Sequence, residues 1–348
     1  MPVPRPVAFV ACLLLGAAAC GFAAAVETAE PPAPLKRLLL VSVTRGFRHS
    51  SIPVAEAEIE ALGRGQARFH LDVLRGSVEQ GKEPDEELKA RFAKAFAPET
   101  LAAFDGVIFA STTGELPIPN LDGFLDWIRS GKAFIGFHAA SDTLKSSDAY
   151  CEMIGGHFEG HPWNAPQEHG FVVHEPQHRL AGMFAERFRF KDEIYRYDRR
   201  FKPENVRVLI SIDMQASKPQ EPYHVPVSWI RDYGKGRVFY TNFGHNEATW
   251  QDPVFRSHAI QGIGWALARF DAPAAPNPEV QAAESVRSAI PAAAAASGRP
   301  ADELRARAEA KIAGDAAWAP GLRPLLLDLR FGDRGKALAA FVTEIDKP

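Results

Sequence analysis

A chain of 348 residues with 46% hydrophobic residues and a formal net charge of −3 is long enough to bury a large core. Lysine and arginine are mixed with aspartate and glutamate and form no basic run, which excludes nucleic acid as a partner on electrostatic grounds. The composition is that of a globular protein with one large domain and smaller appendages.

The N-terminus carries the pattern of a secretory signal peptide. Arg5 precedes an apolar stretch over residues 7–19, which is too short for a comfortable transmembrane span, and small residues at 23–25 offer a cleavage site. We therefore predict a signal peptide over residues 1–25 and a spacer over 26–35. The protein is expected to be exported and to be periplasmic or secreted.

Cys20 allows a second interpretation of the same segment. Residues 18–20, Ala-Ala-Cys, resemble a lipoprotein cleavage site, so lipidation through Cys20 is an alternative to cleavage after residue 25. Of the three cysteines, Cys12 and Cys20 both lie in this segment. Cleavage after residue 25 leaves Cys151 alone, which excludes an intrachain disulfide in the mature protein.

Apolar runs and amphipathic stretches alternate through the first half of the chain. Short apolar runs predict strands over residues 37–43, 67–74, 105–110 and 132–137. Helical spacing predicts helices between them, over residues 51–62, 84–96 and 120–128. This alternation is typical of α/β proteins with right-handed crossovers. We therefore predict a doubly wound, mainly parallel sheet of the flavodoxin-like kind.

Polar loops follow three of these strands, over residues 44–50, 111–115 and 138–142. Because parallel strands end at the same edge of a sheet, the three loops should meet where ligands bind in such folds. The third loop begins at His138 and contains small residues, as does the sharp turn that carries the nucleophile of some hydrolases. A histidine at this position argues against a serine or cysteine hydrolase.

The second half of the chain is predicted to complete the domain. A short helix over residues 148–154 precedes the segment 157–163, in which Gly160 and Pro162 disfavour a helix. Strand-like pieces follow over residues 170–174, 206–212, 225–231 and 237–242, and then a helix over 254–268. The domain is therefore expected to span residues 36–270.

Beyond residue 270 the composition changes. Residues 271–300 are rich in alanine and proline, which predicts a linker. Residues 301–348 have the spacing of amphipathic helices and contain neither histidine nor cysteine. We predict a small helical C-terminal extension with no chemistry of its own.

Several motifs in order along the chain resemble those of a known family. They are Gly-Phe-Arg-His at 46–49, Gly-Phe-His-Ala-Ala-Ser-Asp at 136–142, Gly-Gly-His-Phe at 155–158, His-Pro-Trp at 161–163, Asp-Glu-Ile-Tyr at 192–195, Pro-Val-Ser-Trp at 226–229, and Gly-Lys-Gly-Arg-Val-Phe-Tyr at 234–240 with Gly-His at 244–245. Over about residues 36–270 the chain resembles the trehalose-utilisation (ThuA-like) family.

The resemblance implies both a fold and a biological setting. The fold would be similar to that of class I glutamine amidotransferases, with His138 at the turn that holds the amidotransferase cysteine. The chain is therefore not expected to be a glutamine amidotransferase. The resemblance also implies a role in sugar catabolism, with a small-molecule carbohydrate as substrate and sugar-oxidising enzymes as partners.

Histidine is the residue type to weigh in the candidate site, because it changes charge near neutral pH and also ligates metals. We predict catalytic roles for four side chains, those of His138, Asp142, Glu193 and His49. Asp142 is expected to orient the ring of His138. We predict substrate-binding roles for four more: His161, Trp163, Tyr195 and His245.

Three functions remain open from the sequence. In the first, His49 and His138 together with His245 or His161 bind a divalent metal that assists hydrolysis or isomerisation of a keto-sugar or disaccharide derivative. In the second, the same residues act without metal as general acid and base. In the third, the domain only binds a sugar or a partner enzyme. A divalent metal is the one cofactor considered, and the chain has no dense metal-binding signature.

Overall fold

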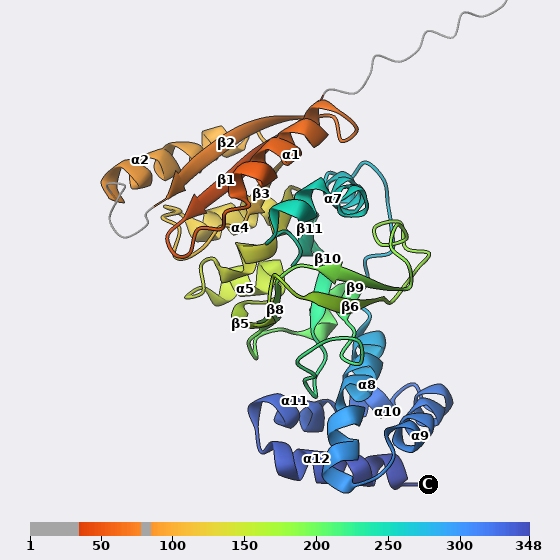
Figure 1. The fold of residues 1–348 in the computed structure, drawn as a ribbon. Helices are drawn as coiled ribbons and strands as arrows, with labels where there is room; N and C mark the ends of the chain where they lie inside the picture. Colours follow the sequence, from red (N-terminus) through yellow and green to blue (C-terminus); the bar gives the residue numbers. More distant parts are fainter. Residues whose placement is uncertain (1–34, 78–84) are drawn as a thin grey trace, which may run out of the picture. The chain divides into compact units, whose positions relative to one another are not determined.

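The computed structural model describes residues 35–77 and 85–348, which form a mixed α/β fold (Figure 1). The predicted signal peptide, Cys20 and nearly all of the predicted spacer therefore lie outside the described residues. Within the described ranges, none of the helices combines the length and the apolar character needed to cross a bilayer.

One nine-stranded sheet forms the framework, in the order β2-β1-β3-β4-β11-β10-β9-β6-β7. Its first five strands are parallel: β1 (Lys36–Thr44), β2 (Phe69–Ser77), β3 (Gly106–Ala110), β4 (Ala133–Phe137) and β11 (Gly236–Thr241). Every residue of β3 and β4 is buried, as expected for central strands covered on both faces. The predicted α/β sheet is confirmed.

Antiparallel strands extend the sheet beyond β11. They are β10 (Pro226–Tyr233), β9 (Arg207–Ile212), β6 (Glu168–Val173) and β7 (Arg187–Lys191). A separate two-stranded sheet pairs β5 (Phe158–Trp163) with β8 (Ile194–Tyr197). Strands β5, β7 and β8 were not predicted from the sequence. Strand β5 contains Gly160 and Pro162, and its pairing with β8 shifts register at Gly160.

Helices cover both faces of the sheet. Helices α1 (Ile52–Arg64) and α7 (Pro253–Ala266) share one apolar cluster with Leu38 and Leu40 of β1. Helices α2 (Asp85–Ala95), α4 (Leu121–Arg129) and α5 (Asp148–Ile154) share a second cluster with Leu39 and Val41, on the other face of the sheet (Figure 1). Alternate side chains of one strand thus enter two cores. The remaining short elements are α3 (Pro98–Leu101), η1 (His138–Asp142), η2 (Pro203–Asn205) and α6 (Glu247–Gln251).

Residues 271–300 are not the irregular linker that their composition predicted. They contain the 20-residue helix α8 (Pro278–Ser297), whose buried face includes Val286, Ile290 and Ala293. The physical reason is that alanine is the best helix former, so an alanine-rich stretch becomes a helix once one face can be buried. Proline stands at the first turn, and Gly298 with φ +70° ends the helix.

The predicted helical C-terminal appendage is confirmed. After α8 come α9 (Ala301–Gly314), α10 (Trp318–Gly321), α11 (Arg323–Phe331) and α12 (Arg334–Asp346). Their buried side chains, among them Leu304, Leu329 and Phe341, form with α8 a third apolar cluster.

Candidate functional site

His138 stands at the sharp turn between β4 and the short helix η1. Its backbone has a φ of +48°, a left-handed conformation that strains a residue other than glycine. The neighbouring Gly136 leaves room for this turn, since a Cβ there would lie 3.2 Å from the Cβ of Ala140. The ring of His138 is completely buried. The strand-to-helix turn thus delivers an imidazole to the carboxyl edge of the sheet.

A backbone carbonyl fixes the tautomer of His138. Its Nδ1 lies 2.8 Å from the carbonyl oxygen of Asn242, which can only accept, so Nδ1 carries the hydrogen and Nε2 keeps its lone pair. The prediction that Asp142 accepts a hydrogen bond from this ring is wrong, because the carbonyl of Asn242 accepts it and Asp142 faces Lys145 Nζ at 3.4 Å. Asn242 takes that role because it follows β11, the parallel neighbour of β4.

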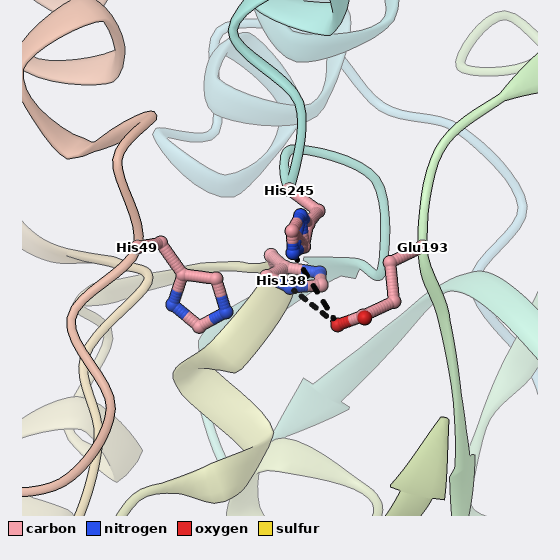
Figure 2. Close-up of side chains that lie close together, drawn as sticks. All are labelled: His49, His138, Glu193 and His245. Carbon is pink, nitrogen blue, oxygen red and sulfur yellow. Dashed lines mark ion pairs between the residues drawn. The ribbon is translucent and has the colours of Figure 1, made fainter. Parts of the chain in front are cut away.

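Two further histidines meet His138 at this edge (Figure 2). His49 comes from the loop after β1, and His245 comes from the loop after β11. The ring centroid of His49 lies 4.8 Å from that of His138 and 5.1 Å from that of His245, and the centroids of His138 and His245 are 5.1 Å apart. Each pair of rings meets edge to face. The structure therefore brings all three predicted metal candidates together.

Glu193, in the turn between β7 and β8, faces the same histidines (Figure 2). Its Oε1 lies 3.8 Å from Nε2 of His138 and 3.6 Å from Nε2 of His245. Its Oε2 lies 3.2 Å from Nδ1 of His161, a half-exposed side chain. The hydroxyl of Tyr195 lies 3.2 Å from Nε2 of His49, and its ring centroid is 4.3 Å from that of His138. Both carboxylate oxygens of Glu193 therefore face imidazole nitrogens.

The cluster has the composition and the spacing of a metal site. One ligand atom from each of four residues lies within 4.8 Å of the other three: His49, His138, Glu193 and His245. Ligand atoms bonded to a tetrahedral ion at about 2.0–2.2 Å are about 3.4 Å apart, so the most distant pair here would have to approach by up to about 1.4 Å. Within the described part of the chain, Nε2 of His138, which faces Oε1 of Glu193, is buried without a hydrogen-bond partner. Such a nitrogen fits a bound cation.

Burial sets the protonation of these groups. It lowers the pKa of His49 to about 3 and that of His245 to about 4, and it holds the pKa of His138 well below its usual value. The rings are therefore neutral at pH 7, the form that ligates metals. Burial also raises the pKa of Glu193 to about 7.

Asn242 is a supporting residue that the sequence analysis missed. Its side-chain Oδ1 accepts from the backbone N–H of Tyr195 at 3.1 Å, and its Nδ2 donates to the Tyr195 carbonyl at 3.0 Å and to the Tyr197 hydroxyl at 2.7 Å. The side chain of Asn242 therefore bonds the backbone of β8 as a neighbouring strand would. The signal in the sequence was its position directly after a strand on the same sheet edge as His138.

Asp192 is a second missed residue, next to the predicted Glu193. Its buried carboxylate accepts from the backbone N–H groups of Gly244 at 2.7 Å, Asn246 at 2.8 Å and Glu193 at 3.1 Å. Burial raises its pKa to about 7, against the hydrogen bonds from Gly244 and Asn246, which lower it. Asp192 thus ties the turn that carries Glu193 to the loop that carries His245.

Trp163 and Cys151 lie apart from this cluster. Trp163, predicted to bind substrate, is fully buried and donates its indole N–H to the carbonyl of Pro219 at 3.0 Å, so that prediction is wrong. The indole fills the apolar core beneath β5 instead. Cys151 is buried in α5, and burial raises the pKa of its thiol to about 12. The thiol is therefore not a nucleophile.

Comparisons with known proteins place the chain in a family. The sequence profile of the trehalose utilisation family, ThuA, matches residues 37–266, more than half of the chain. The chain belongs to the ThuA family. The predicted resemblance is confirmed. A comparison with curated protein sequences finds no match.

Solved structures of ThuA-like proteins share this fold. A ThuA-like protein from Bacteroides uniformis is 20% identical with a TM-score of 0.54, and the alignment covers 71% of this chain and 96% of that one. A ThuA-like protein from Parabacteroides merdae is 17% identical with a TM-score of 0.53, and the alignment covers 71% and 99%. At these identities the likeness concerns the fold.

Proposed function

We propose that this ThuA-family protein is an enzyme that uses a divalent metal ion to act on a carbohydrate. The observation that carries the proposal is the set of four ligand atoms, from His49, His138, His245 and Glu193, within 4.8 Å of one another. The carbohydrate is a keto-sugar or disaccharide derivative, in keeping with the family's description as trehalose utilisation proteins. The reaction is a hydrolysis or an isomerisation.

The donor set indicates which metals would fit. Three imidazoles and one carboxylate suit Zn²⁺ and the neighbouring first-row transition metals better than Mg²⁺ or Ca²⁺, which prefer oxygen ligands. When bound, such an ion polarises a carbonyl group or lowers the pKa of a bound water.

The protein's own side chains hold and complete the site. Asn242 keeps the lone pair of His138 on Nε2, and Asp192 fixes Glu193 and His245 relative to each other. His161, half exposed and 3.2 Å from Glu193, is placed to move a proton to or from a substrate. Phe47, 69% exposed and 4.9 Å from the ring of His49, offers an aromatic face to the apolar side of a sugar ring.

One observation favours a second candidate, acid–base catalysis without metal. The pKa of Glu193 is raised to about 7 by burial, close to the value that suits a general acid or base at neutral pH. Nδ1 of His161 lies 3.2 Å from its Oε2. This candidate uses the same residues and differs from the first in metal content and in its response to chelators.

Elemental analysis of the purified full chain, together with assays on trehalose and its 3-keto derivative, tests the proposal. We expect about one equivalent of a transition metal per chain, with turnover lost on chelation and restored by Zn²⁺. A control variant, His70→Asn on the exposed end of β2, should keep both properties. Turnover by a metal-free protein would contradict the metal-assisted mechanism and support acid–base catalysis without metal. Sugar binding without turnover would assign a non-catalytic binding module.

We also propose that the protein is exported and works beside sugar-oxidising enzymes. The support is the sequence pattern from Arg5 to Ala25 and the family's sugar context. Cell fractionation with N-terminal sequencing tests the export. A mature chain that begins near Val26 supports cleavage, and a lipid-modified Cys20 supports anchoring. An intact Met1 on a cytoplasmic protein would contradict both.

A further inference from the structure

The hydroxyl of Tyr195 has one hydrogen-bond partner in the part of the chain that the structure describes. This partner is Nε2 of His49, at 3.2 Å. A tyrosine hydroxyl keeps its hydrogen at neutral pH and donates it to an acceptor within reach. Since Nε2 is the acceptor that the described residues offer, the hydroxyl donates to it. His49 therefore keeps its lone pair on Nε2 and carries its own hydrogen on Nδ1.

The side chain of Tyr195 is fixed at this position. Its ring centroid lies 4.3 Å from that of His138 and 4.3 Å from that of Phe158. The side chain of Asn242 bonds both the N–H and the carbonyl of Tyr195, at 3.1 and 3.0 Å. These contacts keep the hydroxyl at the cluster when its hydrogen-bond partner changes.

The lone pair on Nε2 of His49 is also the one that a metal ion would use. His49 belongs to the four residues whose ligand atoms lie within 4.8 Å of one another, and its Nδ1 carries a hydrogen. One lone pair serves either a hydrogen bond or a metal ion. Occupation of the cluster therefore takes from the Tyr195 hydroxyl its only acceptor among the described residues. Because Tyr195 is buried, this hydroxyl then needs a new acceptor.

The open side of the cluster indicates where a new acceptor can enter. The side chains of His161 and His245 are 50% and 23% exposed, so the cluster faces solvent beside them. The ring centroid of Tyr195 lies 6.2 Å from that of His161. The oxygens of Glu193 already face imidazole nitrogens, Oε1 that of His245 and Oε2 that of His161. An oxygen atom of a molecule that enters on this side is the acceptor left for Tyr195.

We propose that Tyr195 donates its hydroxyl hydrogen to an oxygen atom of the substrate when a metal occupies the cluster. This inference rests on the proposed metal-assisted function and adds a substrate-binding residue to it. A carbonyl or hydroxyl oxygen of a sugar can accept this bond, whereas a group that has only N–H donors cannot. The same bond stabilises negative charge that develops on a carbonyl oxygen. Tyr195 therefore favours ligands that present an oxygen acceptor to the cluster.

Tyr195→Phe tests the proposal, because it removes the hydroxyl and keeps the ring between His138 and Phe158. Co²⁺ serves as the probe metal, since its visible absorption changes when a further ligand binds. At saturating Co²⁺, we expect acetate, an oxygen ligand, to bind about tenfold more weakly to the variant than to the native chain. Imidazole binds through nitrogen and offers the hydroxyl no acceptor, so its affinity should not fall.

Tyr233→Phe is the matched control. Tyr233 pairs with Gly236, the first residue of β11, and so lies at the opposite edge of the sheet from the cluster. Its hydroxyl contacts Arg129 at 2.5 Å and no residue of the cluster. The substitution should leave the affinities for acetate and imidazole unchanged.

The affinity for Co²⁺ itself gives an independent measurement. In the native chain, Co²⁺ must replace the hydrogen bond between Tyr195 and His49. Removal of the hydroxyl should therefore raise the affinity for Co²⁺ by about 2–10-fold. A side chain that only supports the structure of the site would lower this affinity when it is truncated.

Four results would overturn the proposal. They are equal acetate affinities in the native chain and Tyr195→Phe, an equal loss of acetate and imidazole affinity, a lower Co²⁺ affinity in the variant, and a phenolate-to-metal absorption band in the Cu²⁺-loaded native chain that Tyr195→Phe lacks. The last result would make Tyr195 a ligand. A native chain that takes up no Co²⁺ would overturn the proposed metal-assisted function as well, whereas the four results leave that function intact.

Discussion

The backbone carbonyl of Asn242 accepts the Nδ1 hydrogen of His138 at 2.8 Å, while the side chain of the same residue pairs with the backbone of Tyr195. A single residue thus orients the most buried histidine of the cluster and holds the strand that follows Glu193. Outer partners of this kind usually decide the orientation and the basicity of metal-binding histidines. The geometry of the cluster therefore depends on residues that offer no ligand themselves.

Replacement of His138 by asparagine should remove the site and keep the fold. Asparagine tolerates the left-handed backbone at this position, where φ is +48°, but it has no ring nitrogen to offer. We expect Zn²⁺ affinity, measured with a competing chelator, to fall at least 100-fold. The free energy of unfolding in urea should change by less than about 2 kcal/mol. A variant that binds Zn²⁺ as tightly as the native protein would remove His138 from the ligand set.

Replacement of Asp192 by asparagine should weaken the site indirectly. The carboxylate accepts three backbone N–H groups, and the amide would turn an NH₂ group towards one or more of them. We expect Zn²⁺ affinity to fall about 10–100-fold, as for other outer-shell partners. Asp232→Asn, at an exposed position of β10, is the matched control and should leave affinity unchanged. Equal affinities in the two variants would show that Asp192 has no positioning role.

Acid should destabilise the fold through His258. The ring is fully buried, with Nδ1 2.6 Å from the carbonyl of Leu180 and Nε2 3.0 Å from Oγ of Ser228, and burial lowers its pKa to about 4. Because the unfolded chain has the ordinary pKa of about 6.5, it binds more protons between pH 6.5 and pH 4. Stability from this group is therefore complete above pH 6.5 and is lost as the pH falls towards 4.

The variant His258→Asn keeps a donor near Leu180 and removes the titration. Urea unfolding between pH 7 and pH 4.5 should show a shallower loss of stability than in the native chain, by up to about 1.4 kcal/mol per pH unit. Residual acid sensitivity is expected because burial also lowers the pKa of His174 to about 4. An unchanged pH slope would mean that His258 is protonated equally in both states.

The C-terminal helices should contribute to the stability of the sheet domain. The buried side chain of Asn277 accepts from the N–H of Val208 and donates to its carbonyl, both at 2.9 Å, so it satisfies the backbone of β9. We expect Asn277→Ala to lower the free energy of unfolding by about 1–3 kcal/mol. The exposed control Gln177→Ala should cost less than about 0.5 kcal/mol. Equal effects of both substitutions would mean that α8 is only loosely attached.

Cys151 should have no part in the activity. Its thiol is buried and its pKa is raised to about 12, so it stays protonated at neutral pH. Cys151→Ser should therefore keep native turnover and metal content, and the native protein should show no glutaminase activity. Loss of turnover in this variant without loss of folded protein would restore a thiol mechanism.

Local patterns in the sequence predicted the framework of the fold and the edge at which the site forms. Buried strands such as β3 and β4 are short apolar runs, and the loops with His49 and His138 follow strands of the same parallel sheet. The contribution of Asn242 depends on its pairing with β8, 47 residues earlier, which no local pattern encodes.

Three predictions are wrong for the same reason, namely that contacts distant in sequence decide the structure. Asp142 was assigned to His138 because the two are close in sequence, whereas the neighbouring strand supplies the acceptor. Trp163 has the composition of a sugar-binding side chain, and only its tertiary burial assigns it to the core. The composition of α8 is that of a linker, and the helix is stabilised by burial of its apolar face against the helices that follow.

The hydroxyl of Ser51 donates to the carbonyl of Gly244 at 3.0 Å, although 193 residues separate them. His49 and His245 flank this contact, so the cluster joins an early loop of the domain to its last one. At the usual speed of about 5–20 residues per second, a ribosome needs roughly 10–40 s to bridge that interval. A nascent chain therefore cannot assemble the ligand set before residue 245 has been made, and products terminated earlier never acquire it. The metal content of a preparation would then measure the fraction of chains that extend beyond residue 245 and are correctly folded.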